Sequence, residues 1–370
     1  MPPSPSDSDE HFMSLALDLA SRGEGLVEPN PMVGCVLARD DKPIGQGFHA
    51  AFGGPHAEIV ALADLNSPQD AVGATAYVTL EPCCHHGKTP PCTDALIRSG
   101  VRRVVVAVQD PFAQVDGGGL KKLTDAGIDV TVGVLADRAN HLLAPYRKRI
   151  RTGRPWVIAK WAMTADGRIA TITGESQWIT GAASRQQVHR LRGRVDLIAV
   201  GMGTIDADDP LLTARPAGPR TAHRVVFCRN RLPDVNSQLV QTAAQTPTSL
   251  VVGTKVDQTP LRTLKDCGVQ VIACDTDDSG EMVTTALDHF GSMNLTNLMV
   301  EGGGELLASF IAADQVDECH VYVGPKLFGG QQAAGPIGGA GIAKLADAIN
   351  LSLDRVDSFD HDVRMIYRKA

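Results

Sequence analysis

The feature that most constrains the fold is a regular alternation of short apolar runs with helical stripes. Runs rich in β-branched residues are typical of buried strands, and apolar residues at every third or fourth position are typical of helices. In the first half, this pattern predicts strands at 33–37, 76–80, 104–108 and 128–134 and helices at 12–19, 56–65, 93–99 and 119–126. Such an alternation predicts an α/β fold in which helices cover a sheet.

A basic stretch bracketed by prolines, from Pro145 to Pro155, interrupts the alternation. We interpret it as a solvated connection between two domains, with a phosphate site as the alternative. A second α/β run follows, with strands predicted at 156–162, 197–200, 224–227, 249–252, 269–273, 298–300 and 320–323 and helices at 184–191 and 305–312. The expected organisation is a disordered tail over 1–10, a first domain over 11–150 and a second domain over 151–370.

Charge and composition exclude several classes of protein. The chain of 370 residues carries 35 basic and 42 acidic residues, with 13 against 18 up to residue 150 and 22 against 24 after it. Neither half has the basic character of a nucleic-acid binder. No apolar run approaches the ~18 residues of a membrane span, and residues 1–10 do not resemble a signal peptide. We therefore expect a cytoplasmic protein without membrane association, whose eight cysteines are thiols or metal ligands.

Candidate metal ligands cluster in the first half. His56 and Glu58 open a predicted helix, Cys83 follows a predicted strand, and Cys92 precedes another helix. One histidine and two cysteines supply three zinc ligands and leave the fourth position for water, which marks a catalytic zinc. Zinc lowers the pKa of that water toward neutrality, and Glu58 is well placed to carry its proton to a leaving amine. The pattern His-x-Glu followed by Pro-Cys is that of zinc deaminases.

The second cysteine departs from the usual spacing of that pattern. The position three residues after Cys83 is His86, and the next distant cysteine is Cys92. Cys84 and His86 are therefore rival ligands, and we favour Cys83 because adjacent cysteines rarely bind one metal together. The same residues are also compatible with a structural zinc site, or with buried cysteines that bind no metal.

At these residues the sequence resembles the deaminase half of the bifunctional riboflavin-biosynthesis family RibD. The resemblance rests on Pro29–Gly34, His56–Glu58 and Tyr77–Cys92, and that family has a long insert between its two cysteine ligands. It implies a cytidine-deaminase-like α/β/α sandwich with one zinc ion per chain on three ligands and a glutamate as proton shuttle. The residues implied are His56, Cys83 and Cys92 for zinc, Glu58 for the proton, and Asn30, His49, His85, Lys88 and Thr89 for the substrate.

One residue and one segment depart from the family pattern. Cys84 stands where the family usually has serine. In the segment Asp110–Gly119, Phe112 and Ala113 replace an asparagine and a proline, while the glycines remain. These differences concern contacts to the substrate and leave the zinc ligands intact.

In the second half, two glycine loops follow predicted strands. Val200–Thr204 contains Gly-Met-Gly, and Glu301–Gly304 contains three glycines and opens a helix, although neither has the standard Gly-x-Gly-x-x-Gly fingerprint. Glycines at a helix N-terminus let a phosphate approach backbone N–H groups. Each loop alone is equally well a tight turn, but together on one sheet they favour a nucleotide site.

The second half also resembles RibD, in its reductase half. The resemblance rests on Ala165–Ala170, Thr173–Thr180, Val200–Arg215 and Val300–Gly303. It implies a dihydrofolate-reductase-like α/β domain that uses NADPH. The residues implied are Ala162, Trp178, Thr204, Asp208, Gly303, Gly304, Glu305, Leu306, Leu307, Ala308 and Ser309 for the cofactor, and Ser176, Arg192, Leu212, Arg215 and Glu301 for the substrate.

Elementary chemistry supports several of these residues. Arg192 and Arg215 are suited to bind a 5′-phosphate with forked hydrogen bonds. Trp178 offers a flat wall for a nicotinamide, with a packed core aromatic as the alternative. Lys160, on the first strand of this half, is a candidate to polarise an opening ribosylamine, and an ordinary half-exposed lysine is the alternative.

Taken together, the two resemblances imply a bifunctional enzyme of riboflavin biosynthesis. Its first domain would deaminate a phosphorylated diaminopyrimidine, and its second would reduce the ribosyl chain with NADPH; the family suggests a homo-oligomer. Two competing hypotheses are a zinc deaminase acting on RNA bases and a non-catalytic nucleotide sensor. An RNA deaminase would need a basic, aromatic-rich groove, whereas aromatic residues make up 4% of this chain.

Overall fold

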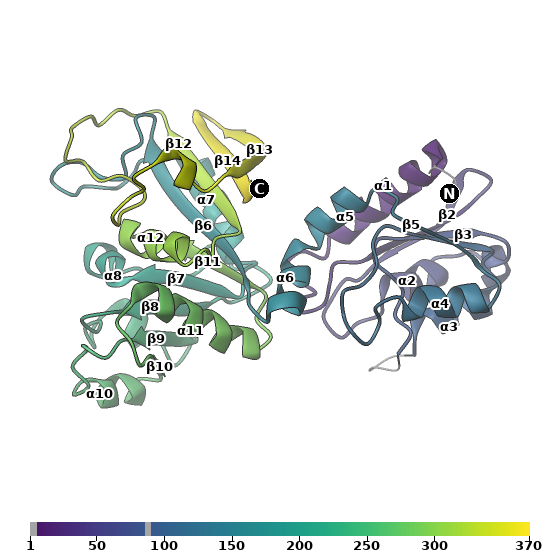
Figure 1. Cartoon of the computed structure of the whole chain (residues 1–370), viewed down its shortest axis with the longest axis horizontal. Coiled ribbons are helices and arrows are strands. Elements are labelled where there is room, and N and C mark those ends of the chain that lie inside the picture. Colours follow the sequence, from purple (N-terminus) through teal and green to yellow (C-terminus); the bar gives the residue numbers. More distant parts are fainter. Residues whose placement is uncertain (1–5, 86–89) are drawn as a thin grey trace. The chain divides into compact units, whose positions relative to one another are not determined.

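The computed structural model describes residues 6–85 and 90–370. The chain divides into two compact units, Met1–Thr152 and Gly153–Ala370, each with its own sheet (Figure 1). Each sheet carries helices on both faces, so the predicted α/β class is confirmed.

The first unit is built on a five-stranded mixed sheet of order β2-β1-β3-β4-β5. β1 pairs antiparallel with β2 and β3, and the remaining pairs, β3 with β4 and β4 with β5, are parallel. Parallel neighbours place their carboxyl ends at one edge of the sheet, and ligand sites form there. The strands are β1 (Gly34–Arg39), β2 (Lys42–Phe48), β3 (Thr75–Val78), β4 (Arg103–Val106) and β5 (Asp129–Val132).

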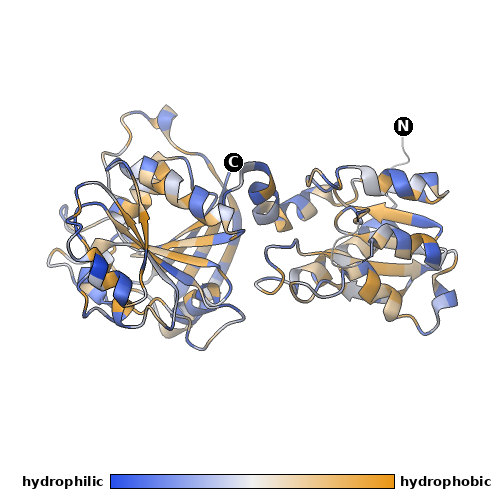
Figure 2. Cartoon of the chain, turned by 90° about the horizontal axis from the view of Figure 1, so that it is seen from below, coloured by the Kyte–Doolittle hydropathy of each residue, from blue (hydrophilic) through white to orange (hydrophobic). Residues whose placement is uncertain are grey.

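Helices cover both faces of this sheet. One apolar core joins the sheet to α1 and α5, and a second joins its other face to α2, α3 and α4 (Figure 1). Figure 2 shows that hydrophobic residues concentrate on the strands and on the helix faces turned toward them. The helices are α1 (Asp7–Ser21), α2 (Ala57–Ala63), the 3-10 turn η1 (Pro68–Ala71), α3 (Cys92–Ser99), α4 (Gly118–Asp125), α5 (Ala136–Leu142) and α6 (Ala144–Thr152).

Strand β2 is absent from the sequence prediction, because its glycines and proline disfavour a strand. In the structure those glycines allow helix α2 to pack directly on the strand. A Cβ on Gly45 would lie 2.5 Å from the Ala61 carbonyl oxygen, and one on Gly47 would lie 2.4 Å from the Ala61 nitrogen. This close packing holds α2, which carries Glu58 in its first turn and is preceded by His56.

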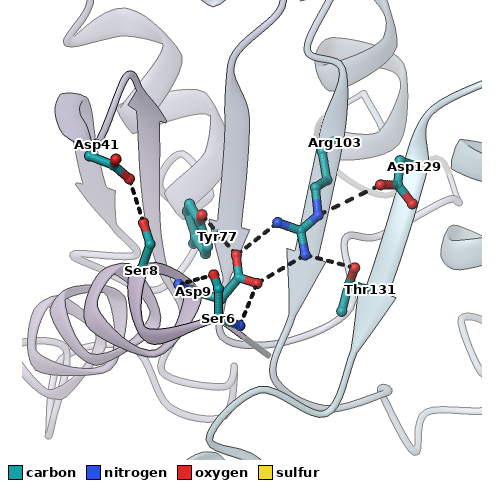
Figure 3. A network of polar contacts seen from close by, with 8 residues as sticks. All are labelled: Ser6, Ser8, Asp9, Asp41, Tyr77, Arg103, Asp129 and Thr131. Carbon is teal, nitrogen blue, oxygen red and sulfur yellow. Dashed lines mark hydrogen bonds and ion pairs between the residues drawn. The ribbon is translucent and has the colours of Figure 1, made fainter. Parts of the chain in front are cut away.

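The disordered tail predicted over residues 1–10 is wrong for residues 7–10, because α1 begins at Asp7. Ser6 caps the helix: its hydroxyl accepts the Asp9 N–H at 3.1 Å, and the Asp9 carboxylate accepts the Ser6 N–H at 3.3 Å. Asp9 is buried and also accepts Arg103 (2.8 and 3.1 Å) and the Tyr77 hydroxyl (3.0 Å) (Figure 3). Burial acts to raise the pKa of Asp9, but these partners hold it below its ordinary value. Residues 6–10 are thereby anchored to the sheet.

The second unit is built on a nine-stranded sheet of order β10-β9-β8-β7-β11-β6-β12-β14-β13. Seven strands, from β10 to β12, run parallel, and the C-terminal hairpin β13–β14 adds an antiparallel edge. The strands are β6 (Trp156–Thr164), β7 (Leu197–Gly201), β8 (His223–Cys228), β9 (Thr248–Val252), β10 (Gln270–Ala273), β11 (Asn297–Glu301), β12 (Glu318–Gly324), β13 (Leu351–Phe359) and β14 (Asp362–Lys369).

Two buried clusters fill the space between this sheet and its helices. One contains residues of α11 and α12, and the other contains residues of α7, α8, α9 and α10. The helices are α7 (Ala182–Arg192), α8 (Met202–Asp208), α9 (Gln238–Gln241), α10 (Leu261–Asp266), α11 (Ser279–Ser292), α12 (Gly304–Ala312) and the 3-10 turn η2 (Leu345–Asp347). Within residues 6–85 and 90–370, no helix has both the length and the apolar character that crossing a membrane requires.

Candidate active sites

Three metal-ligating side chains meet at helix starts in the first unit. His56 caps α2, Cys92 is the first residue of α3, and Cys83 lies in the loop after β3. The His56 Nδ1 atom lies 3.6 Å from the Cys83 Sγ and 3.3 Å from the Cys92 Sγ, and all three ligand atoms lie within 4.8 Å of one another. Tetrahedral bonds of about 2.0–2.3 Å place neighbouring donors roughly 3.3–3.8 Å apart. The residues therefore fit a zinc ion.

The rival ligand Cys84 is not part of this group. The Cys84 Sγ lies 3.8 Å from the Gln114 carbonyl oxygen, beside the loop that follows Asp110. His86 lies outside the described residues. Hydrogen bonds from Cys92 and His56 lower the pKa of the Cys83 thiol, which suits a thiolate ligand.

Glu58 lies in the first turn of α2, two residues beyond His56. Its side chain is buried and lines a cavity of about 360 Å³ together with His56 and Cys83. Burial raises the pKa of Glu58 above its ordinary value. A carboxyl group with a raised pKa beside a metal site can both take up and release a proton.

The same cavity contains several of the predicted substrate contacts. Asn30, His49 and His85 line it. The His49 Nδ1–H donates to the Pro55 carbonyl at 2.9 Å, and its Nε2 accepts the Asn30 amide at 3.2 Å. Burial lowers the pKa of His49, so the ring is neutral, with Nδ1–H as a donor and Nε2 as an acceptor. Lys88 and Thr89, also predicted here, lie outside the described residues.

Helix α6 forms a wall of this cavity, which corrects the prediction of a solvated connection at 145–155. Tyr146, Arg149 and Ile150 line the cavity, and the buried Tyr146 donates its hydroxyl to Asp110 at 2.9 Å. Apolar positions four residues apart place one face of the helix on the unit. The basic residues between them hide this stripe in the sequence.

Glu81 is a residue whose role the sequence analysis missed. Its buried carboxylate accepts four backbone N–H groups, from Asp110 (3.2 Å), Gly117 (3.1 Å), Gly119 (2.9 Å) and Leu120 (3.2 Å). It therefore fixes the segment 110–119, whose Phe112 lines the cavity, against the loop that carries Cys83. The sequence does contain a signal for this role of Glu81. A carboxylate stands two residues before a ligand cysteine, and a glycine-rich segment follows downstream.

We expect Glu81→Gln to loosen this segment, because an amide cannot accept four N–H groups. Hydrogen bonds to charged groups contribute about 1.5–3 kcal/mol each and are not additive, so the free energy of unfolding should fall by about 2–4 kcal/mol. Hydrogen exchange at residues 117–120 should accelerate, and Glu10→Gln, an exposed control on α1, should change neither quantity. Unchanged exchange in Glu81→Gln would contradict this role.

A second cavity, of about 690 Å³, lies at the carboxyl ends of β7, β8 and β11. Both predicted glycine loops line it, through Gly201–Gly203 and through most of the stretch 303–309. Gly302 and Gly303 each have a φ of +79°, which favours glycine. A Cβ on Gly302 would lie 3.2 Å from the Thr204 hydroxyl, so the two loops lie side by side. The open cradle at the start of α12 fits a dinucleotide phosphate.

Trp178 is not a core aromatic, since its side chain is 59% exposed. The Arg185 guanidinium lies 4.5 Å from the centre of its ring, and the adjacent Gln177 donates to Asp208 at 2.8 Å. Ser176 lies half-buried in the same loop, and Ala162 lies on β6. None of Trp178, Asp208 and Ala162 lines the 690 Å³ cavity as the structure describes it.

A buried charge cluster joins β6, β11 and α7. Glu301 accepts two hydrogen bonds from Arg192 (both 2.8 Å) and one from Lys160 (3.2 Å). Burial acts to raise the pKa of Glu301, but Lys160 and Arg192 hold it at about 2. Two N–H groups of the Arg192 guanidinium therefore bind Glu301 and not an open phosphate site. Arg215, in contrast, is exposed. Leu212 is buried in the loop whose Thr213 carbonyl accepts Arg192 at 3.4 Å.

The fold and the two sites define a two-domain enzyme. Its first domain carries a zinc deaminase site, and its second is a reductase domain with a nucleotide-binding cavity. Residues 6–108 match the cytidine and deoxycytidylate deaminase zinc-binding region, and residues 155–365 match the RibD C-terminal domain. The chain belongs to the RibD family. It is a bifunctional riboflavin-biosynthesis enzyme, with a zinc-dependent deaminase domain and an NADPH-dependent reductase domain.

Relatives and solved structures match over nearly the whole chain. Riboflavin biosynthesis protein RibD of Actinobacillus pleuropneumoniae is 38% identical, covering 99% of this chain and 98% of the relative. RibD of Escherichia coli strain K12 is 39% identical over 96% of this chain and 98% of its own. The structure of Acinetobacter baumannii RibD, form 1, superposes with a TM-score of 0.84 at 35% identity, covering 98% of this chain and 99% of that chain. These matches confirm the predicted resemblance in both halves.

Proposed function

We propose that the first unit removes the 2-amino group of 2,5-diamino-6-ribosylamino-4(3H)-pyrimidinone 5′-phosphate by hydrolysis. The second unit then reduces the ribosyl side chain of the product to ribityl with NADPH. The observation that carries the proposal is the group His56, Cys83 and Cys92 beside the buried Glu58, in a cavity large enough for a pyrimidine. A solved Thermotoga maritima relative, 31% identical with a TM-score of 0.83 over 98% of this chain and 99% of that chain, is described as the corresponding deaminase and reductase.

In the deaminase, each residue of the cavity has a distinct task. Zinc, when bound to His56, Cys83 and Cys92, lowers the pKa of a bound water toward neutrality. Glu58 takes a proton on its carboxylate and returns it to the departing amine, which leaves as ammonia. Asn30, His49 and His85 orient the pyrimidine, and Lys88 and Thr89 are assigned to its ribose phosphate.

In the reductase, the charge cluster positions the sugar. Lys160, held by Glu301, polarises the opening ribosylamine, while Arg192 fixes Glu301 in place and Ser176, Leu212 and Arg215 bind the rest of the substrate. The cofactor residues are Ala162, Trp178, Thr204 and Asp208 with the loop 303–309. These side chains would hold the nicotinamide beside the substrate and exclude water, and the cofactor would supply the hydride.

Removal of zinc separates the two activities and tests the proposal. We expect dialysis against a chelator to abolish ammonia release from the diaminopyrimidine, and added zinc to restore it. NADPH oxidation with the deaminated intermediate should persist in the zinc-free protein. Ammonia release that survives complete loss of zinc, or no reaction of the loaded protein with either compound, would contradict the proposal.

We further propose that the protein acts in the cytoplasm on small molecules, without nucleic-acid or membrane partners. None of the eight cysteines, all of which lie in the described part of the chain, forms a disulfide, which agrees with a reducing compartment. The acidic balance of both halves disfavours a polynucleotide substrate. Activity on a free phosphorylated pyrimidine, with none on RNA, is the expected outcome.

Finally, we propose that the protein forms a homo-oligomer through the hairpin at the edge of the second sheet. β13 is the terminal strand, and a bulge between Leu353 and Arg355 keeps Leu351, Leu353 and Val356 on one face. Their side chains are 41%, 57% and 54% exposed. An apolar edge strand of this kind is a template for pairing with a second copy.

Substitution of this stripe should dissociate the oligomer. We expect light scattering to report an oligomer for the wild type and a monomer for Leu353→Lys combined with Val356→Lys. Val72→Lys, at an exposed apolar position of the first unit, is the matched control and should remain associated. A wild-type monomer, or a stripe variant that stays associated, would contradict this interface.

A further inference from the structure

One wall of the second unit's cavity comes from a strand end that the sequence analysis did not single out. β8 ends at Cys228, and the exposed residues Arg229, Asn230 and Arg231 follow it and line the cavity. The glycine loops after β7 and β11 provide other walls. In the sheet order, β7 lies between β8 and β11, so all three strand ends face the same cavity.

The two guanidinium groups on this wall differ in their contacts. Arg231 forms an ion pair with Asp206 of α8. Arg229 has no ion-pair partner within residues 6–85 and 90–370. Glu305, the one carboxylate among the described lining residues, lies 3.3 Å from the Gly339 N–H, which donates to it. Arg229 is therefore a positive charge at the border of the cavity, and it forms no ion pair with Glu305 or with any other described residue.

We propose that Arg229 binds the 2′-phosphate of NADPH and makes the reductase prefer NADPH to NADH. The inference rests on the reductase function proposed above and names the residue that selects its cofactor. Guanidinium groups bind phosphates with paired, charge-assisted hydrogen bonds. Because NADH carries a hydroxyl in place of this phosphate, it gains nothing from that contact.

The position of Arg229 in the sheet supports this role over contact with the pyrophosphate. Dinucleotide pyrophosphates bind where a glycine loop opens a helix, and here that place is Gly302–Gly304 at the start of α12. β8 lies two strands from β11, which is roughly 10 Å at normal strand spacing. In NAD-specific sheets, a carboxylate near a neighbouring strand end accepts the ribose 2′-hydroxyl, whereas arginine accommodates the 2′-phosphate. Residues 228–231 contain no carboxylate.

The test compares both cofactors and two nucleotide fragments on Arg229→Gln, Arg229→Lys and the wild type. Adenosine 2′,5′-bisphosphate and adenosine 5′-monophosphate differ only in the 2′-phosphate, so calorimetry with each isolates that contact without turnover. We expect Arg229→Gln to raise the KM for NADPH and the Kd for the bisphosphate about 10- to 100-fold. The KM for NADH, the Kd for the monophosphate and kcat should stay within about 2-fold, and Arg229→Lys should keep most of the preference. Arg262→Gln, at an exposed position on α10, is the control and should match the wild type.

Three further outcomes overturn the assignment in distinguishable ways. An equal loss with NADPH and NADH would assign Arg229 to the pyrophosphate that both share. Unchanged binding of all ligands in Arg229→Gln would remove Arg229 from the site. If the wild type binds neither fragment and oxidises neither cofactor, the reductase function itself fails. Turnover of NADH with an unchanged kcat, which uses the second unit, shows that this unit is folded in each variant.

Discussion

Glu58→Gln should lower the rate of ammonia release by about 10²–10⁴-fold, while the variant retains its zinc and its reductase activity. The loss follows from the chemistry of the site, because a glutamine amide cannot take a proton from the attacking water or pass one to the amine. Zinc is retained because Glu58 is not among the three ligand side chains. The reductase residues lie in the other unit, so NADPH oxidation with the deaminated intermediate should stay within about 2-fold of the wild type.

Three measurements on the same preparation make this prediction sharp. Metal analysis reports zinc per chain, and two separate assays report ammonia release and NADPH oxidation. Glu10→Gln, exposed on α1, is the matched control with the same chemical change. Retention of more than about a tenth of the ammonia release by Glu58→Gln would show that another group moves the proton.

Glu301→Gln should abolish reduction and destabilise the second unit by about 3–5 kcal/mol. The side chains of Glu301, Lys160 and Arg192 are 11%, 12% and 14% exposed, so the substitution leaves two buried cations facing a neutral amide. Removal of one partner from a buried ion pair costs this much because the remaining charge stays desolvated. Chemical denaturation monitored on the second unit measures the loss, and ammonia release should persist.

A second substitution separates charge from packing in this cluster. Adding Lys160→Met to Glu301→Gln removes one stranded cation and should recover part of the stability but not the reductase activity. Glu281→Gln, exposed on α11, is the control. If the free energy of unfolding of Glu301→Gln lies within about 1 kcal/mol of the wild-type value, the cluster does not stabilise the unit.

The same cluster sets an acid limit for the second unit. Glu301 has a pKa of about 2 in the folded chain, below the ~4.3 of an unfolded glutamate. Its contribution to stability is therefore complete above about pH 5 and is lost as the pH falls from about 4.3 through 2. The pH dependence of unfolding in that window should be shallower in Glu301→Gln than in the wild type.

The zinc site was predictable from sequence because its residues sit in short motifs at the junctions of elements. His56, Glu58, Cys83 and Cys92 each lie at a helix start or in a loop after a strand, and the apolar periodicity locates those junctions. Glu81 and Arg229 were not predictable in the same way. The role of Glu81 depends on the backbone amides that the tertiary fold places around it. The role proposed for Arg229 depends on the cavity that the fold forms beside it.

Three of the elements that the sequence analysis missed, β2, β13 and α6, have physical causes that the structure shows. β2 is rich in glycine because α2 packs on it, and the stripe of β13 is broken by a bulge and by charged neighbours. In α6, basic residues mask the contact made by Tyr146 and Ile150. For β2 and α6, tertiary packing overrides the local pattern that propensity rules use, and for the mostly exposed β13 the bulge interrupts the alternation.

The central claim is that one chain deaminates and then reduces the same pyrimidine phosphate. Mass spectrometry of the products of 2,5-diamino-6-ribosylamino-4(3H)-pyrimidinone 5′-phosphate, with and without NADPH, tests it most directly. We predict exchange of one amino group for oxygen without NADPH, and a further gain of two hydrogens only when NADPH is present. Zinc-loaded protein that leaves the compound unchanged in both conditions would contradict the claim.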